Sequence, residues 1–371
     1  MKKILMVHQG HELYGSDRMF LLSIKTILKL YPRAVIDVIL PKSGDLSRYI
    51  LLNHSKNVQL SLVDLAIVRK SEIQKLDFSV LYYLIKNIAH WRKKIHSYDL
   101  VYINSIVVID FILLTRYFKG KKIIHVHELL GPSWRFLFSK VLQFSQCSLV
   151  FISKASLKSI GPSNKSLSVI HNGKDHILDH EPNLVSAGEI RILMVGRLNS
   201  WKGQDLLLDA ISIVQDQYRG RMTIKILGGT YNNQYWFEKA LRKKIQDLQL
   251  DQIVKLIDFE KETDIHYQWS NIVVVPSKLP EPFGLVAIEA MRFSKVVIAA
   301  GHGGLTEIVD DNVTGILFQP NSKRALAEKI EYLIENPSVI REIGLNANAK
   351  FNSFYTQDHY IERLERFISK I

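Results

Sequence analysis

Short apolar runs alternate with stretches of helical periodicity along nearly the whole chain. The first series of runs predicts buried strands at Lys3–His8, Val35–Leu40, Val58–Leu62, Leu100–Ile103, Lys122–Val126, Leu149–Ile152 and Ser168–Ile170. A second series predicts strands at Arg191–Val195, Thr223–Leu227, Ile253–Leu256, Ile272–Val275, Val296–Ala299 and Gly315–Phe318. Strands that alternate with helices are typical of parallel sheets covered by helices. The pattern therefore predicts a chain of the α/β class.

The two series of strands indicate two domains. The tetrapeptide Ile-Leu-Met-Val occurs at 4–7 and again at 192–195, each time in the first strand of its series. A polar stretch that opens with Glu181-Pro182-Asn183 is typical of a linker. A chain of 371 residues is long enough for two domains of ordinary size. We therefore expect Rossmann-like domains over residues 1–182 and 183–352.

Helices are expected between the strands and at the end of the chain. A long helix is predicted from about Glu72 to His96 in the first half. Another helical pattern runs from Lys323 to Glu335, is interrupted at Asn336-Pro337, and continues to Ile371.

Composition narrows the class of protein. Apolar residues make up 47% of the chain, enough for sizeable cores. Cys147 is the only cysteine, which excludes a disulfide framework and suits a reducing compartment. The apolar run at the start is too short for a signal peptide, and the run from Ile106 to Leu114 is broken by Asp110 and too short to span a bilayer. We expect a cytoplasmic protein that is soluble or peripheral at the inner face of the cell membrane.

The net positive charge of the protein comes from the first half of the chain. Residues 1–185 hold 26 Lys and Arg against 13 Asp and Glu, whereas residues 186–371 hold 23 of each. Such asymmetry favours an anionic partner. Signatures of nucleic-acid binding are not evident, and basic residues are interleaved with aromatic ones at 81–94, 116–122 and 134–136. An anionic membrane surface is therefore preferred to nucleic acid; the alternative is solubilising charge beside aromatic residues of the core.

The most informative segment runs from Pro280 to Met291. Phe283, Gly284 and Leu285 are expected to open a helix, where free N–H groups bind anions. Glu281 stands just before this helix and can reach hydroxyl groups on that side. Glu289 lies about 8 Å farther along the axis, at ~1.5 Å per residue, and its side chain tilts back toward the helix start. Two carboxylates with an anion seat between them suit a nucleotide-sugar, which has a hexose, a diphosphate and a ribose.

This segment, with its Glu-x7-Glu spacing inside Glu-Pro-Phe-Gly, resembles that of the family 4 glycosyltransferases. The resemblance implies retaining enzymes of the GT-B fold, in which two Rossmann-like doubly wound domains face each other across a cleft. It also implies that residues 1–182 bind the acceptor, that residues 183–352 bind the nucleotide-sugar, and that residues 353–371 form a helix that crosses back to the first domain.

The resemblance assigns roles within the second domain. Gly196-Arg197-Leu198 with Lys202-Gly203 is similar to the family's phosphate-binding segment, so Gly196, Arg197 and Lys202 are expected at the donor diphosphate. Two fixed cations can stabilise the departing nucleotide, and no metal or other cofactor is then required. An Asp-x-Asp pair typical of metal-dependent transferases is absent from the sequence. Glu281, with the backbone of Phe283, Gly284 and Leu285, is expected to hold the hexose, and Glu289 the ribose.

In the first domain the resemblance is looser. His127, rather than His125, is matched to a histidine that faces the reacting sugar, because His127 lies nearer the carboxyl end of its strand. Gly15 is matched to a glycine pair in which this chain has tyrosine at the first position. Gly301-His302-Gly303-Gly304 is similar to a glycine turn near the nucleotide.

These observations predict a retaining, metal-independent hexosyltransferase. Its partners are expected to be a nucleotide diphosphate sugar, a glycan or lipid-linked oligosaccharide, and an anionic membrane, with no nucleic acid. Surface-polysaccharide assembly, such as that of O-antigen, capsule or exopolysaccharide, is the expected setting. A sugar-nucleotide epimerase or glycan phosphorylase on the same fold is an alternative, as is a non-enzymatic basic module that binds membrane or nucleic acid. The donor base, donor sugar, acceptor and linkage stay open.

Overall fold

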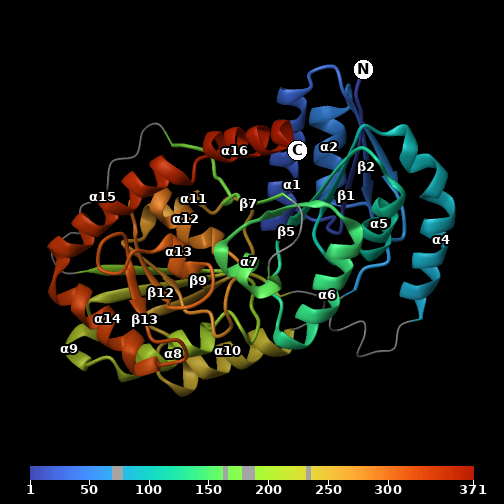
Figure 1. Cartoon of the computed structure of the whole chain (residues 1–371). Helices are drawn as coiled ribbons and strands as arrows, with labels where there is room; N and C mark the ends of the chain where they lie inside the picture. Colours follow the sequence, from blue (N-terminus) through green and yellow to red (C-terminus); the bar gives the residue numbers. More distant parts are fainter. Residues whose placement is uncertain (69–77, 162–165, 178–188, 231–234) are drawn as a thin grey trace. The chain divides into compact units, whose positions relative to one another are not determined.

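The computed structural model describes residues 1–68, 78–161, 166–177, 189–230 and 235–371. The chain folds into two compact units, one made of residues 1–173 with 357–371 and the other of residues 174–356 (Figure 1). The units divide after Gly173 and Thr356, whereas the sequence-based divisions were placed after residues 182 and 352. Residue 182 and the expected linker lie outside the described residues.

The first unit is built on a parallel sheet of seven strands in the order β3-β2-β1-β4-β5-β6-β7. The strands are β1 (Lys3–His8), β2 (Val35–Leu40), β3 (Val58–Leu62), β4 (Leu100–Asn104), β5 (Lys121–Val126), β6 (Ser148–Phe151) and β7 (Leu167–Val169). Each lies within one residue of its predicted bounds. Strands buried on both faces are continuous apolar runs, which is why the sequence locates them well.

Helices cover both faces of this sheet (Figure 1). They are α1 (Gly15–Leu30), α2 (Asp45–His54), α4 (Ser79–Lys94), α5 (Ile109–Leu114), α6 (Pro132–Ser145), α7 (Lys154–Ile160) and α16 (Gln357–Lys370), with 3-10 turns at Ile95–Ser97 and Thr115–Tyr117. Successive strand residues point to opposite faces. Ile4 and Met6 accordingly pack in the core formed with α1, α2 and α16, whereas Leu5 and Val7 pack in the core formed with α4, α5 and α6. The first part of the helix predicted at 72–96 falls at 72–77, outside the described residues.

The second unit repeats this plan with six parallel strands in the order β10-β9-β8-β11-β12-β13. The strands are β8 (Ile190–Val195), β9 (Met222–Leu227), β10 (Val254–Ile257), β11 (Ile272–Val275), β12 (Val296–Ala300) and β13 (Ile316–Phe318). The helices are α8 (Gln204–Ile213), α9 (Asp216–Arg219), α10 (Tyr235–Asp247), α11 (Asp264–Trp269), α12 (Leu285–Arg292), α13 (Leu305–Ile308), α14 (Lys323–Glu335) and α15 (Pro337–Phe354). The prediction of two doubly wound α/β units is confirmed.

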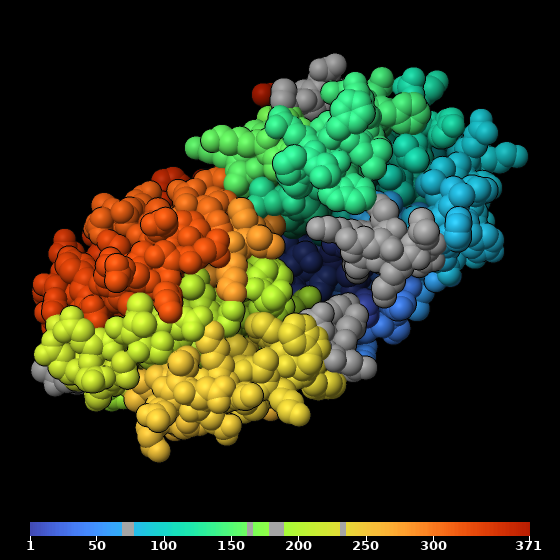
Figure 2. All heavy atoms as spheres, turned by 90° about the horizontal axis from the view of Figure 1, so that it is seen from below, coloured from blue at the N-terminus to red at the C-terminus, as the bar shows by residue number. Residues whose placement is uncertain are grey.

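Surface-exposed aromatic residues gather on two helices of the first unit. Phe78, at the start of α4, has 78% of its surface exposed, and Tyr82 on the same helix has 61%. Phe136 of α6 is 73% exposed. Lysines accompany these rings: Lys86 lies over the ring of Tyr82 and Lys140 over that of Phe136. Figure 2 shows α4 in cyan and α6 in green at the surface of this unit. Among the described residues, no helix is both long and apolar enough to cross a membrane.

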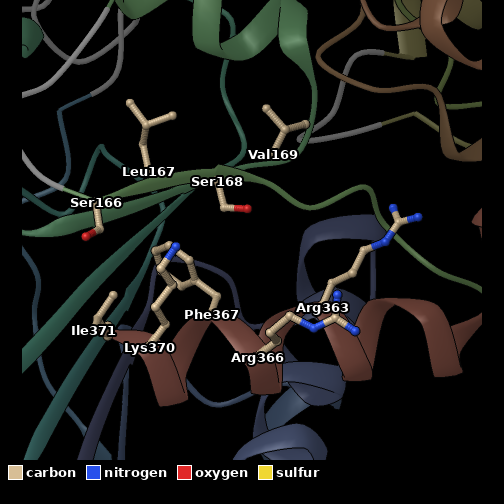
Figure 3. Close-up of a pocket in the computed structure, with 9 residues that line it drawn as sticks. All are labelled: Ser166, Leu167, Ser168, Val169, Arg363, Arg366, Phe367, Lys370 and Ile371. Atoms are coloured by element: carbon tan, nitrogen blue, oxygen red, sulfur yellow. The ribbon is translucent and has the colours of Figure 1, made fainter.

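The last helix, α16, belongs to the first unit and packs against α1. The Tyr360 hydroxyl lies 2.8 Å from that of Ser23, and the Lys29 ammonium lies 3.3 Å from the Glu365 carboxylate. A pocket of about 460 Å³ lies between α16 and the edge strand β7. Figure 3 shows Ser168 and Phe367 lying on opposite sides of it, from the strand and the helix. The predicted site residues do not line this pocket.

Candidate functional site

Several of the predicted donor-binding residues lie in the second unit, in the loops that follow two central strands of its sheet. Strand order reverses between β8 and β11, which are neighbours in the sheet. In doubly wound folds, ligands bind outside the carboxyl ends of the strands at such a reversal. Residues 196–203 follow β8, and residues 276–284 follow β11. The Gly-Arg-Leu and Glu-Pro-Phe-Gly segments thus occupy the two loops at this point.

An ion pair joins the two loops. Lys202 Nζ donates to Glu281 Oε1 across 2.7 Å, and both side chains are largely withdrawn from solvent, with 17% and 7% exposed. The Ser277 hydroxyl donates to the same carboxylate oxygen. His302 Nε2 in turn bonds the carbonyl oxygen of Ser277 across 2.8 Å. A buried carboxylate is therefore held by a cation and a hydroxyl group.

These contacts set the charge of Glu281. Burial alone would raise its pKa, but the Lys202 ammonium and the hydrogen bonds from Lys202 and Ser277, with a contribution from His302, outweigh burial. The pKa of Glu281 is consequently lowered from its ordinary value. The side chain is an anion at neutral pH and can accept hydrogen bonds from sugar hydroxyls.

The loop after β8 is ordered by its own side chains. Asn199 Oδ1 accepts hydrogen bonds from the backbone N–H groups of Trp201 and Lys202, at 3.2 Å and 3.0 Å. The Lys202 ammonium also lies 4.5 Å from the centre of the Trp201 ring. Gln204 donates to the carbonyl oxygen of Arg197 across 2.9 Å. The half-buried Arg197 and Lys202 are thus fixed on one short loop.

The glycine turn after β12 supports the backbone around Glu281. Gly303 has a φ of 62°, and a Cβ there would lie 2.6 Å from the carbonyl oxygen of Glu281. Gly304 donates its N–H to that same carbonyl across 2.8 Å. The turn was predicted to approach the nucleotide, and in the structure it packs against the carboxylate-bearing loop. Only glycine tolerates both the left-handed φ and the close approach at 303.

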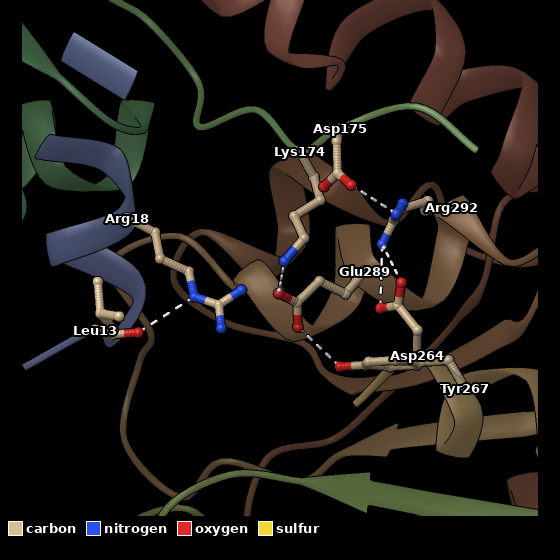
Figure 4. A network of polar contacts seen from close by, with 8 residues as sticks. All are labelled: Leu13, Arg18, Lys174, Asp175, Asp264, Tyr267, Glu289 and Arg292. Carbon is tan, nitrogen blue, oxygen red and sulfur yellow. Dashed lines mark hydrogen bonds and ion pairs between the residues drawn. The ribbon is translucent and has the colours of Figure 1, made fainter. Parts of the chain in front are cut away.

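Glu289 lies on α12, which begins at Leu285 after Gly284. Both of its carboxylate oxygens have partners in the second unit: Lys174 Nζ lies 3.0 Å from Oε1, and the Tyr267 hydroxyl donates to Oε2 across 2.9 Å (Figure 4). Burial, followed by the charge of Glu289, raises the pKa of Tyr267 well above its ordinary value, so this hydroxyl stays a donor. Glu289 contacts neither Glu281 nor Lys202, so the two predicted acidic anchors form separate clusters.

A second cation completes the cluster around Glu289. Arg292, one turn along α12, lies 2.8 Å from the Asp175 carboxylate and 3.2 Å from that of Asp264 (Figure 4). Its side chain is only 5% exposed. Lys174 and Asp175 are the first residues of the second unit, so these bonds fasten the start of the unit to α12.

In the first unit, His127 follows β5 directly. Its Nε2 lies 2.9 Å from Asn104 Oδ1 at the end of β4. Burial, together with the neighbouring His125 and His8, holds the pKa of His127 well below its ordinary value. The ring is therefore neutral at physiological pH. His125 faces inward, and its Nδ1 lies 2.6 Å from the Tyr102 hydroxyl.

Two further residues of the first unit are the predicted Gly15 and Glu128, which follows His127 in the sequence. Gly15 is the first residue of α1, close in sequence to the buried Asp17. Glu128, beside His127, accepts hydrogen bonds from the Ser105 hydroxyl and from the backbone N–H groups of Ile106 and His127. Burial outweighs these bonds and raises the pKa of Glu128.

Sequence reasoning missed several polar partners of the predicted residues. The missed side chains are those of His8, Asp17, Asn104, Lys174, Asn199, Tyr267 and Ser277. A signal existed for His8 and Asn104, because both end or follow predicted strands in a parallel sheet. Within the described part of the chain, no group of three or more His, Cys, Asp or Glu side chains is arranged to hold a metal ion.

Comparison with known families supports these observations. Residues 176–350 match the family described as "Glycosyl transferases group 1". The chain is similar to O-antigen chain mannosyltransferase C of Escherichia coli, with 28% identity over 66% of this chain and 64% of that protein. It is 25% identical to the lipopolysaccharide 1,2-N-acetylglucosaminetransferase of Salmonella typhimurium, over 66% of each chain. The chain therefore spans less than two thirds of the length of these curated relatives.

Solved structures share the fold over the whole chain. Anabaena HepE in complex with UDP and glucose superimposes with a TM-score of 0.81 at 24% identity, with both chains covered fully. Sucrose-phosphate synthase from Thermosynechococcus elongatus has a TM-score of 0.78 at 19% identity, over 100% of this chain and 99% of that one. The expectation of the GT-B fold class is confirmed by these likenesses.

Proposed function

Residues 176–350 form a domain of the group 1 glycosyl transferases, and from this premise we propose that the protein transfers a hexose from a nucleotide diphosphate sugar to a glycan or lipid-linked oligosaccharide. Relatives named for O-antigen and lipopolysaccharide synthesis support bacterial surface-polysaccharide assembly as the setting. A fold neighbour in complex with UDP and glucose supports a nucleotide-sugar donor.

The observation that carries the proposal is the contact of 2.7 Å between Lys202 and Glu281. This contact places Lys202, a cation suited to phosphate, beside Glu281, a carboxylate suited to sugar hydroxyl groups. Both lie beyond the carboxyl ends of β8 and β11. Arg197 and Lys202 take the diphosphate, and Glu281 takes the hexose hydroxyls. When donor binds, Lys202 exchanges part of its interaction with Glu281 for phosphate oxygens. The backbone of Phe283, Gly284 and Leu285 contributes beside Glu281.

Ribose binding is assigned to Glu289. Its carboxylate is held by Lys174 and Tyr267, so its orientation is fixed before ligand arrives. A diol can donate two O–H hydrogen bonds to one carboxylate. Because the oxygens of Glu289 are already held in place, little conformational entropy is lost when the diol binds. Gly15, Gly196 and the neutral ring of His127 complete the proposed set of donor-contacting residues.

The proposed reaction retains the anomeric configuration. The bond between the anomeric carbon and the phosphate oxygen breaks, and the acceptor oxygen attacks from the same face within one ion-pair-like step. The acceptor proton passes to the departing phosphate oxygen. Arg197 and Lys202 stabilise the negative charge that develops on the nucleotide diphosphate. Metal independence is part of the proposal, because these two cations supply positive charge at the leaving group; transfer should persist in excess EDTA, and a requirement for Mg²⁺ would refute this part.

An anionic membrane is the proposed partner of the first unit, at the inner face of the cell membrane. Exposed rings with lysines beside them on α4 and α6 support this assignment. Aromatic side chains favour the headgroup level, and each basic residue near an anionic surface adds about 1 kcal/mol of attraction. No role with nucleic acid is proposed.

A thermal-shift screen tests the proposed function. Wild-type protein is heated with a panel of UDP-, GDP- and other nucleotide-sugars, and a ligand specific to the native state raises the melting temperature. At a hundredfold excess over Kd, the stabilisation is about 2.7 kcal/mol. Glu281→Ala should lose the response, whereas Glu328→Ala, a change at an exposed position of α14, should keep it. Absence of any response across the panel would contradict the transferase and favour the binding module.

A further inference from the structure

Four polar side chains form a continuous hydrogen-bonded chain in the first unit. Asp17 Oδ1 lies 2.6 Å from His8 Nε2. His8 Nδ1 lies 2.9 Å from Asn104 Nδ2, and Asn104 Oδ1 lies 2.9 Å from His127 Nε2. His8 and Asn104 are register partners at the ends of β1 and β4, and His127 follows β5. The chain therefore runs across the carboxyl ends of three neighbouring strands, starting from the first turn of α1.

The direction of each hydrogen bond in this chain is determined from one end. Asp17 Oδ1 accepts from His8 Nε2, because the other ring nitrogen of His8, Nδ1, faces the NH₂ group of Asn104, which can only donate. The amide group of Asn104 therefore donates to His8 Nδ1. That amide must turn its oxygen toward His127, so His127 Nε2 carries the proton. The backbone carbonyl oxygen of Asn104 lies 3.4 Å from His8 Nδ1, which is farther away than the side-chain amide.

Burial and neighbouring residues hold these four side chains in their hydrogen-bonded arrangement. His8, Asp17 and Asn104 are buried, so water does not compete for these bonds. The ring of His8 stacks on Phe20, with centroids 4.6 Å apart. Gly10 covers the first bond so closely that a Cβ there would lie 1.9 Å from Asp17 Oδ1. The second oxygen of Asp17 accepts the backbone N–H of Tyr14 at 2.9 Å, which fixes the carboxylate.

We propose that Asp17, acting through His8 and Asn104, determines which ring nitrogen of His127 carries the proton. Asp17, His8 and Asn104 are positioning residues in this scheme. With Nε2 bound to Asn104, His127 presents Nδ1 as a hydrogen-bond acceptor. This step rests on the proposed function. His127 Nδ1 then accepts a hydrogen bond from a hydroxyl group of the sugar, and it cannot bind a sugar or phosphate oxygen that lacks a proton.

Asp17→Asn provides a shape-conserving test. The backbone N–H of Tyr14 requires an oxygen, so the new amide must point its NH₂ group toward His8 Nε2. His8 must then carry its proton on Nδ1, the Asn104 amide must reverse, and its NH₂ group must donate to His127 Nε2. The proton of His127 is thereby moved to Nδ1, three hydrogen bonds away from the substitution. Asp37→Asn is the matched control, because Asp37 accepts from Tyr98 in the same unit but lies outside the chain of bonds.

The measurement is ¹⁵N NMR of the full-length protein labelled at histidine, with the His127 signals assigned from a His127→Gln spectrum. In wild type and Asp37→Asn we expect the protonated signal at Nε2, and in Asp17→Asn at Nδ1. An unchanged His127 tautomer in folded Asp17→Asn overturns the proposal. Should that variant fail to fold, neutron diffraction from wild-type crystals decides: deuterons on His8 Nε2 and His127 Nε2 support the proposal, and a deuteron on His8 Nδ1 with His8 Nε2 bare contradicts it. Both readouts are independent of glycosyl transfer, so they are unaffected if the proposed function fails.

Discussion

Lys202 Nζ and Glu281 Oε1 lie 2.7 Å apart, although 79 positions separate the two residues in the chain. The contact ties the loop after β8 to the loop after β11 and holds a buried carboxylate ionised. Two residues with separate predicted roles are therefore mutually dependent, and changing either one alters the surroundings of the other.

We first expect this ion pair to stabilise the second unit in a pH-dependent way. Lys202→Met leaves Glu281 buried without its cation, which should cost about 1–3 kcal/mol at neutral pH. The folded-state pKa of Glu281 lies below its ordinary 4.5, so the stabilisation is present above that pH and is lost as pH falls through the folded-state value. Urea unfolding of wild type and Lys202→Met should therefore converge in acid. A difference that grows as pH falls would contradict the assigned ion pair.

Glu281→Ala should abolish hexosyl transfer while the protein remains folded. The substitution removes the carboxylate that is proposed to bind the hexose. Because this site is buried, water cannot fully replace the lost hydrogen bonds. Transfer is measured with a radiolabelled donor, and folding by circular dichroism. Glu328→Ala on the exposed face of α14 serves as the charge-matched control. Near-wild-type transfer by Glu281→Ala would remove the role given to this residue.

Loss of both loop cations should weaken nucleotide diphosphate binding. Charge-assisted hydrogen bonds contribute about 1.5–3 kcal/mol each, so Arg197→Ala with Lys202→Ala should raise Kd by at least tenfold. Isothermal titration calorimetry with UDP and GDP measures the effect. Lys323→Ala with Arg324→Ala removes the same charge from exposed positions of α14 and should leave Kd unchanged. Equal affinity in both double variants would refute the assigned phosphate contacts.

His127→Ala should slow transfer without weakening nucleotide binding. Loss of one hydrogen bond to the sugar corresponds to about 1–3 kcal/mol, or about five- to 150-fold in kcat/KM. The expected signature is an unchanged Kd for the nucleotide diphosphate beside reduced turnover. If the Kd rises in parallel with the loss of turnover, His127 belongs to the nucleotide site instead.

Vesicle binding should depend on charge and salt. Vesicles containing phosphatidylglycerol should retain the protein at low ionic strength and release it in high salt, because salt screens the attraction. Lys86→Glu with Lys93→Glu on α4 should weaken retention, whereas Lys239→Glu with Lys243→Glu on α10 should not. Equal retention by neutral vesicles would refute the electrostatic part of the proposal.

The sequence predicted the strands well because each one is a continuous apolar run. It also located the segments 196–203 and 280–291, whose Gly, Pro and charged residues are distinctive. The contacts between those segments could not be predicted from the sequence. They exist because β8 and β11 are neighbours in the sheet, and the sequence does not reveal the order of the strands. His8 and Asn104 are a similar case: each ends a strand, but their pairing exists only because β1 lies beside β4.

The division into units was harder to predict than the strands. Lys174 and Asp175 are bound to Glu289 and Arg292, so they belong to the second unit although they precede the polar stretch used to place the boundary. Composition marks where a chain is polar, whereas the boundary depends on long-range partners of a few charged side chains.

The order of synthesis imposes a constraint on the first unit, because residues 357–371 complete a core that begins at residue 4. Tyr360, Leu364 and Ile368 reach that core only after the whole second unit has left the ribosome. Until then the apolar residues of α1 lack their covering helix. The apolar face of α1 that α16 covers therefore stays exposed on the nascent chain until residues 357–371 have emerged.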